Sequence, residues 1–96
     1  MRSFDVGEVD SHFWAEFQVK GILGAVIVRD ADTGLEYDVE FVTPYTLHES
    51  AEDALRRSSV HVVPRNTVVV PDITRDHLQR AVDAIQLGDL TPRPVD

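Results

Sequence analysis

The chain has 96 residues, with 17 acidic and 9 basic side chains and a formal net charge of −8 at pH 7. A chain of this length forms one small domain with one thin core, so a deep cleft between two lobes is not expected. Because phosphate backbones and anionic membranes repel an acidic protein, nucleic acid and membranes are excluded as favoured partners, and basic proteins are preferred.

The first half of the chain carries the acidity and shows the spacing of strands. Residues 1–53 hold 12 acidic and 3 basic side chains, whereas residues 54–96 have a net charge of +1. Between His12 and Lys20, two sets of side chains alternate, with Phe13, Ala15, Phe17 and Val19 on one face and Trp14, Glu16, Gln18 and Lys20 on the other. This period of two predicts a strand over residues 12–20.

Two further strands are predicted, joined by a tight turn. After a reversal at residues 21–24, residues 25–29 form a short run rich in β-branched side chains. The segment Asp30–Gly34 is rich in Asp and Gly and predicts a hairpin loop. Residues 35–41 then alternate most cleanly, with apolar Leu35, Tyr37, Val39 and Phe41 between acidic Glu36, Asp38 and Glu40.

Proline and capping residues delimit the middle of the chain. Pro44 ends the third strand because it has no N–H to donate. Ser50 resembles a helix cap followed by carboxylates, which predicts a short helix to Arg57. Residues 60–63 and 67–70 are two apolar β-branched runs separated by Pro64–Asn66, and they form either a hairpin or one kinked strand, with the second run favoured as a strand.

The strongest helix signal lies after these runs. Thr74 can cap a helix, Ile73 and Leu78 are spaced for a hydrophobic staple, and Gly88 marks the expected end. An apolar stripe runs along it at helical spacing: Leu78, Ala81, Val82 and Ile85. Residues 89–96 contain two prolines and no periodicity, so we expect one domain over residues 1–88 and a flexible tail over 89–96.

Together these elements predict an α+β fold. It consists of a single four- to five-stranded, mostly antiparallel sheet with one long C-terminal helix and one short helix packed on one face. The opposite face of the sheet then meets solvent or a partner. Since the chain shows neither the apolar run of a signal peptide nor that of a membrane span, a cytoplasmic location is expected.

No motif in the sequence indicates catalysis, a cofactor or a metal. Cysteine is absent, and the histidines lack the spacing that places two imidazoles on one ion. No serine lies in a Gly-x-Ser-x-Gly turn, and no glycine-rich phosphate loop is present. The run Asp30-x-Asp32-x-Gly34 resembles the opening of a calcium loop, but its glycine comes one residue early and the distal Glu is missing, so a hairpin turn is favoured.

Four carboxylates and one tryptophan form the candidate binding surface: Glu16, Glu36, Asp38, Glu40 and Trp14. Glu36, Asp38 and Glu40 point to one face and form either a solvated outer face or an acidic docking surface; a catalytic pair would need one of them buried. Trp14 and Glu16 are expected on the same side of the sheet, and tryptophan is a frequent interface anchor. Alternatively, a one-residue change of register, or cover by the segment around Phe4 and Val6, buries Trp14.

Three segments carry a resemblance to a known family. They are Phe13–Phe17, Tyr37–Leu47 with its Thr43-Pro44-Tyr45 turn, and Thr67–Ile73 leading into the helix of Leu78–Ile85. Their order resembles that of small immunity proteins of bacterial polymorphic-toxin systems, in which a Thr-Pro-aromatic turn ends one strand and an apolar strand leads into an amphipathic helix. Residues 25–32 and the Pro64–Arg65 break depart from this pattern. The resemblance implies an inhibitor that occludes the active site of a cognate toxin in the producing cell, and it assigns no binding residue.

The expected function is therefore that of a non-enzymatic acidic inhibitor, monomeric or weakly dimeric when free. Its partner would be a basic toxin domain that acts on nucleic acid, because an acidic surface complements a basic cleft. Two alternatives stay open. One is a phage or mobile-element inhibitor that mimics nucleic acid and binds a host nuclease or defence complex; the other is a small oligomerising structural module.

Overall fold

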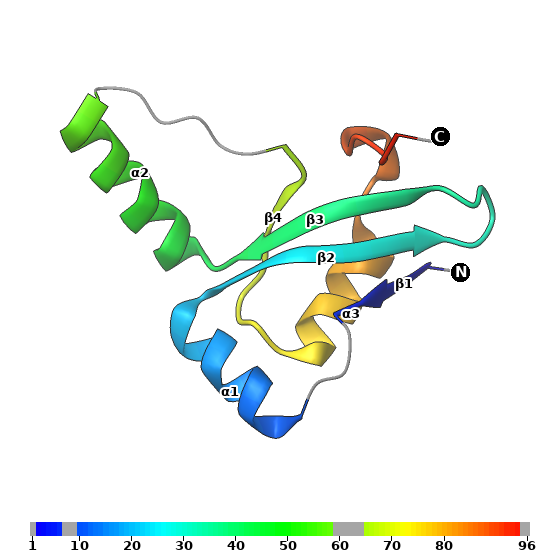
Figure 1. Cartoon of the computed structure of the whole chain (residues 1–96), viewed down its shortest axis with the longest axis horizontal. Helices are drawn as coiled ribbons and strands as arrows, with labels where there is room; N and C mark the ends of the chain where they lie inside the picture. Colours follow the sequence, from blue (N-terminus) through cyan, green and yellow to red (C-terminus); the bar gives the residue numbers. More distant parts are fainter. Residues whose placement is uncertain (1, 7–9, 59–64, 95–96) are drawn as a thin grey trace.

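A computed structural model describes residues 2–6, 10–58 and 65–94 of the chain. Its elements are β1 (Arg2–Asp5), α1 (Ser11–Lys20), β2 (Ile22–Asp30), β3 (Glu36–Val42), α2 (Pro44–Ser58), β4 (Thr67–Val69), α3 (Arg75–Ala84) and a 3-10 turn at Leu87–Asp89. The strands form one sheet in the order β1-β2-β3-β4 (Figure 1). The α+β class and the four-stranded sheet are confirmed.

The sheet is mixed rather than mostly antiparallel. β1, β2 and β3 pair antiparallel, whereas β4 runs parallel to β3, with Glu40 opposite Thr67 and Val42 opposite Val69. The chain passes from β3 through α2 before it returns as β4, and a crossover of this kind allows two neighbouring strands to run in the same direction. The expected strand over residues 67–70 is confirmed over Thr67–Val69, and the run at residues 60–63 lies outside the described residues.

Residues 11–20 form a helix, so the strand predicted over residues 12–20 is wrong. The Asp10 carboxylate caps the helix by accepting a hydrogen bond from the Phe13 N–H at 3.0 Å. Gly21 ends it in the left-handed conformation and donates its N–H to the Phe17 carbonyl. No residue of this helix is fully buried: Phe13, Trp14 and Phe17 pack partly buried against the core, whereas Val19, expected on the same face as Phe13 and Phe17, is 88% exposed.

The β2–β3 hairpin is confirmed. The Asp30 carboxylate accepts hydrogen bonds from the Asp32 N–H and the Thr33 hydroxyl, both at 3.1 Å. Its two oxygens therefore stabilise the turn. Gly34 closes the turn at φ 74°, where a residue without a Cβ is favoured. β2 begins earlier than expected, at Ile22, and an irregularity follows Leu23 in its pairing with β3.

α2 begins at Pro44 instead of Ser50. The Thr43 hydroxyl accepts from the Thr46 N–H at 3.3 Å, and Pro44 occupies the first helical position, where a missing N–H costs nothing. None of the described residues of α2 is buried, and the helix extends away from the sheet (Figure 1). The prediction that the short helix packs on the sheet is therefore wrong.

The hydrophobic core lies on one face of the sheet, covered by α3 with α1 beside it. It is built from Leu23, Val26, Val28, Tyr37, Val39, Phe41, Val70, Ile73, Leu78 and Val82. Ile73 and Leu78 are fully buried on either side of the Thr74 cap, as their spacing predicted. α3 ends at Ala84 with Ile85 as its cap, so the long helix expected to reach Gly88 is wrong.

Thr74→Ala is expected to lower the free energy of unfolding by about 1 kcal/mol, because the Thr74 hydroxyl satisfies the His77 N–H at 3.1 Å. Thr74→Ser keeps the oxygen and is expected to lose much less. Urea denaturation of both variants measures the difference. Equal losses in the two variants would contradict a capping role for the hydroxyl.

Residues 91–94, here called the edge segment, lie along β3 beyond the reach of β4. The Arg93 N–H donates to the Glu36 carbonyl at 2.7 Å. The Asn66 side chain lies between β3 and the edge segment. Its amide nitrogen donates to the carbonyls of Asp38 (3.0 Å) and Thr91 (2.8 Å), and its amide oxygen accepts from the Thr91 N–H (2.8 Å). The described part of residues 89–96 thus lies against the sheet, while the flexibility of this segment and the domain boundary at residue 88 stay predictions.

Candidate functional site

Glu36, Asp38 and Glu40 project from the face of β3 opposite the core, as the alternation predicted. Two arginines meet this row. The Arg29 Nε donates to Glu36, and Arg93 lies 3.8 Å from Glu36 through Nη1 and 3.3 Å from Asp38 through Nε. The hydrogen bond and charge of Glu36 raise the pKa of Arg29. Glu36 and Asp38 are therefore compensated within the chain.

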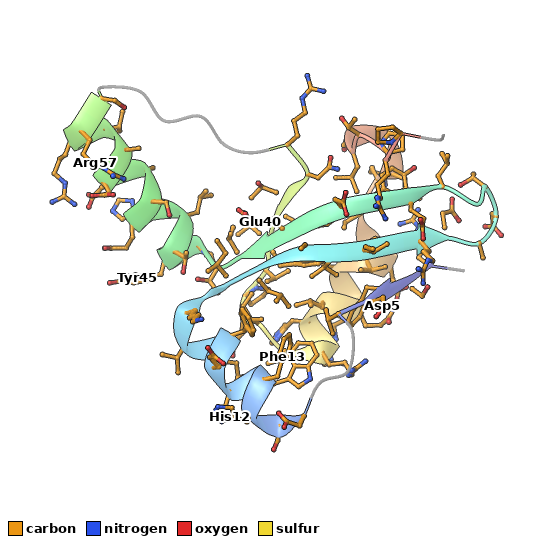
Figure 2. The ribbon with its side chains drawn as sticks, viewed as in Figure 1. Asp5, His12, Phe13, Glu40, Tyr45 and Arg57 are labelled. Carbon is orange, nitrogen blue, oxygen red and sulfur yellow. The ribbon has the colours of Figure 1, made fainter. Side chains whose placement is uncertain are left out.

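Glu40 differs from its two neighbours in the row. It forms no ion pair with any residue that the structure describes. Its side chain reaches towards β2, since a Cβ added at Gly24 would lie 4.0 Å from Glu40 Oε2. It lies close to the point where β3 leads into α2 (Figure 2). Glu40 is thus the member of the predicted row that keeps its charge available to a partner.

Trp14 does not lie beside these carboxylates. Its ring is half-buried on α1 and packs edge-on against Phe13, with 5.3 Å between ring centroids. The Arg75 guanidinium is 5.3 Å from the Trp14 ring and 5.8 Å from the Phe4 ring. Since α1 packs on the core face, Trp14 and the acidic row lie on opposite sides of the sheet. Trp14 on α1 is thus linked to Phe4 on β1 through the guanidinium of Arg75 on α3, which both rings contact.

Glu16 is also remote from the row. It is exposed on α1 and forms an ion pair with Lys20 at 3.0 Å, one helical turn away. The hydrogen bond and charge of Lys20 lower the pKa of Glu16 below its ordinary value of 4.5. The structure therefore brings together Glu36, Asp38 and Glu40 and leaves Trp14 and Glu16 apart from them.

The Glu16 carboxyl is expected to titrate with a midpoint below pH 4.5 in an NMR experiment, and Lys20→Gln is expected to return the midpoint towards 4.5. Because the folded pKa is lowered, the pair stabilises the fold above pH 4.5, and this contribution is lost as the pH falls through the lowered pKa. An unchanged midpoint in Lys20→Gln would show that the pair does not form in solution.

α2 presents an aromatic and acidic face that the sequence analysis missed. Tyr45, Glu49 and Glu52 recur at i, i+4 and i+7, which places them on one side of the helix. Tyr45 is 74% exposed and points away from the sheet (Figure 2). Glu49 forms no ion pair with a described residue, and Glu52 lies 3.1 Å from His48. The helical start signalled by Thr43-Pro44 would have revealed this spacing.

The other side of α2 is apolar and only partly buried. Leu47, Ala51, Ala54 and Leu55 follow helical spacing, and Leu55 is 52% exposed. At the end of the helix Arg57 pairs with Asp53, one turn earlier. Both sides of α2 therefore offer side chains to a partner while adding nothing to the core.

The described residues show one small hollow and no metal-binding group. Within residues 2–6, 10–58 and 65–94, no group of His, Asp and Glu is placed to hold a metal ion. A hollow of about 260 Å³ lined by Gly34, Leu35, Glu36, Arg93 and Pro94 is smaller than typical ligand pockets. No helix in the described part of the chain is both long and apolar enough to cross a membrane.

Comparison with known proteins adds no relative. No family model, no curated protein and no solved structure matches the chain. The resemblance to immunity proteins therefore stays a prediction.

Proposed function

We propose that this protein is a non-enzymatic acidic inhibitor that binds a basic protein partner, as an immunity protein binds its toxin domain. One observation carries the proposal: α2 is a helix of 15 residues with no buried side chain. Isolated helices of about 12–15 residues are marginal in water, because most helical stability in proteins comes from packing. A partner that covers α2 supplies the packing that its own fold does not.

The contact surface that we propose consists of Tyr45, Glu49 and Glu52 on α2, together with Glu40 on β3. Tyr45 provides an exposed aromatic anchor, a residue type enriched at binding hot spots. The carboxylates, on a chain of net charge −8, steer a basic partner and suppress acidic ones. Of the five residues first predicted, Glu40 is kept. Glu36 and Asp38 are paired with arginines, Glu16 is paired with Lys20, and Trp14 packs against other side chains of the fold.

Inhibition follows from the charge of this surface. A domain that cleaves or modifies nucleic acid holds phosphates in a basic cleft, and carboxylates on a projecting helix compete for the same cationic side chains. Such an inhibitor acts in the cytoplasm of the producing cell, where the toxin is made, and needs neither a cofactor nor a metal.

The test is affinity capture from the cells that encode the protein, with quantitative mass spectrometry of the bound partners. The baits are the unaltered chain, a Tyr45→Ala/Glu49→Lys variant, and Glu16→Lys as a control of equal charge change on α1. We expect a stoichiometric basic protein with a toxin-like domain, depleted about tenfold or more on the α2 variant and retained on the control. Recovery of no protein, or equal capture by all three baits, would overturn the proposal.

The identity of the captured protein separates this function from the nucleic-acid mimic, whose target is a host nuclease or defence complex. A small oligomerising module is the other candidate, favoured by the exposed apolar side of α2 with Leu55. Light scattering of the purified protein decides it. A stable dimer that Leu55→Glu converts to a monomer would favour the module, and a monomer at all concentrations would exclude it.

A further inference from the structure

The outer edge of β3 is covered in two different ways. β4 pairs with residues 40–42, and beyond it the edge segment covers residues 36–38. An uncovered strand edge is a template for another extended chain, because its N–H and C=O groups lack partners. What covers the edge at Glu36 and Asp38 therefore determines whether β3 can accept another strand.

This part of the edge holds an arginine of the same chain, Arg93. Glu36 and Asp38 are two residues apart on one strand and point to the same face, so that a single guanidinium reaches both. Between them and the edge segment, the Asn66 side-chain amide acts like a peptide group, donating one hydrogen bond to Thr91 and accepting another. Together with the Glu36 carbonyl, these groups form a site for an extended segment with arginine at the position of Arg93.

The edge segment is bound to this site by few contacts. Its residues are exposed. Among the described residues, one backbone hydrogen bond joins it to β3, from the Arg93 N–H to the Glu36 carbonyl. Because neighbouring residues of an extended chain point in opposite directions, Pro92 and Pro94 lie where an N–H would point away from β3. A segment held by few, solvent-exposed hydrogen bonds opens locally at a small fraction of the global free energy of unfolding.

We propose that the edge of β3 at Glu36–Asp38 is a docking site for an extended, arginine-bearing peptide segment, and that residues 91–94 occupy it in cis. A partner segment binds by strand addition and takes the place of the edge segment. The tethered edge segment competes for the site at an effective concentration of about millimolar. The partner segment must therefore bind with a dissociation constant below about a millimolar. This site is separate from α2 and does not depend on the proposed function.

The first test is an NMR titration with a synthetic peptide that has the sequence of residues 88–94. Arg93→Ala weakens the cis segment but leaves Glu36, Asp38 and Asn66 intact, so we expect this variant to bind the peptide about tenfold more tightly than the unaltered chain. Arg80→Ala, which removes an exposed arginine paired with Asp76, is the matched control and is expected to bind like the unaltered chain. Binding by Arg93→Ala no tighter than by the control would overturn the proposal, as would equal binding of a peptide with glutamate in place of arginine.

The second test uses the unaltered chain and does not depend on the folding of any variant. We expect the amide hydrogens of Thr91 and Arg93 to exchange with solvent about 100-fold faster than those of Val39 and Phe41, because the edge segment leaves β3 without global unfolding. Exchange of all four amides at one rate would show that the site is never vacated and would overturn the proposal. Substitutions at Tyr45 and Glu49 are expected to leave both results unchanged, so the failure of one proposal does not imply failure of the other.

Discussion

Replacing Gly21 with alanine is expected to lower the free energy of unfolding by about 3 kcal/mol. Gly21 is buried between α1 and β2 with φ at 69°, and a left-handed backbone costs an L-residue roughly 1–2 kcal/mol. The added Cβ would lie 2.9 Å from Thr43 Oγ1 and overlap Thr46 Oγ1, so the start of α2 would have to shift. The same residue accepts the Thr43 N–H through its carbonyl at 3.0 Å, which ties the end of α1 to the start of α2.

Gly24→Ala is the matched control for this substitution. Gly24 lies three residues further on, in β2, but its backbone is not left-handed and its added Cβ meets only Glu40 Oε2, at 4.0 Å. We expect the free energy of unfolding of Gly24→Ala to change by no more than about 1 kcal/mol, since ordinary surface substitutions rarely exceed this. Urea denaturation followed by circular dichroism measures both variants. Similar losses for the two alanines would contradict the role assigned to the backbone and packing at Gly21.

The parts of the fold that the sequence predicted well are those in which local signals agree. The strand of residues 35–41 combines period-two alternation with an Asp- and Gly-rich turn before it and Pro44 after it, and the structure places β3 at Glu36–Val42. The cap and staple around Thr74 likewise placed the start of α3 correctly. Neither feature depends on contacts far along the chain.

The helix at residues 11–20 was missed because its apolar residues satisfy two periodicities at once. Phe13 and Phe17 are compatible with a strand face and also with one helical turn, and Trp14 extends the helical stripe. The decisive signals were at the ends, where Asp10 caps the helix and Gly21 terminates it. The parallel direction of β4 had no local signal, since it depends on how the connection after β3 returns to the sheet.

The acidic row illustrates how far alternation can predict a site. Alternation placed Glu36, Asp38 and Glu40 on one face correctly. The register of the hairpin also sets Arg29 directly opposite Glu36, and this pairing could have been predicted from the hairpin alone. The contact of Arg93 with Asp38 was not, because it requires the edge segment to return to β3. The charge that remains available therefore lies at Glu40 and on α2 instead of along the whole row.

Trp14→Ala is expected to lower the free energy of unfolding by about 2–3 kcal/mol, less than the loss for a fully buried tryptophan because the ring is half-buried. Its ring contacts Phe13 and the Arg75 guanidinium, which also lies over Phe4, so its removal loosens three elements at once. Thermal or urea denaturation of the purified variant measures the loss. A stability equal to that of the unaltered chain would return Trp14 to the list of candidate partner contacts.

Tyr45→Ala is the counterpart of that experiment, and the expected result is the opposite. Tyr45 is 74% exposed, so we expect a change in stability within about 0.5 kcal/mol. The binding free energy of the variant for the proposed basic partner is expected to weaken by about 2 kcal/mol, because truncation of an aromatic anchor typically costs that much. The two measurements would then distinguish the aromatic residues of α1 and α2: Trp14 contributes to folding and Tyr45 to binding. Loss of stability without loss of affinity in Tyr45→Ala would remove α2 from the contact surface.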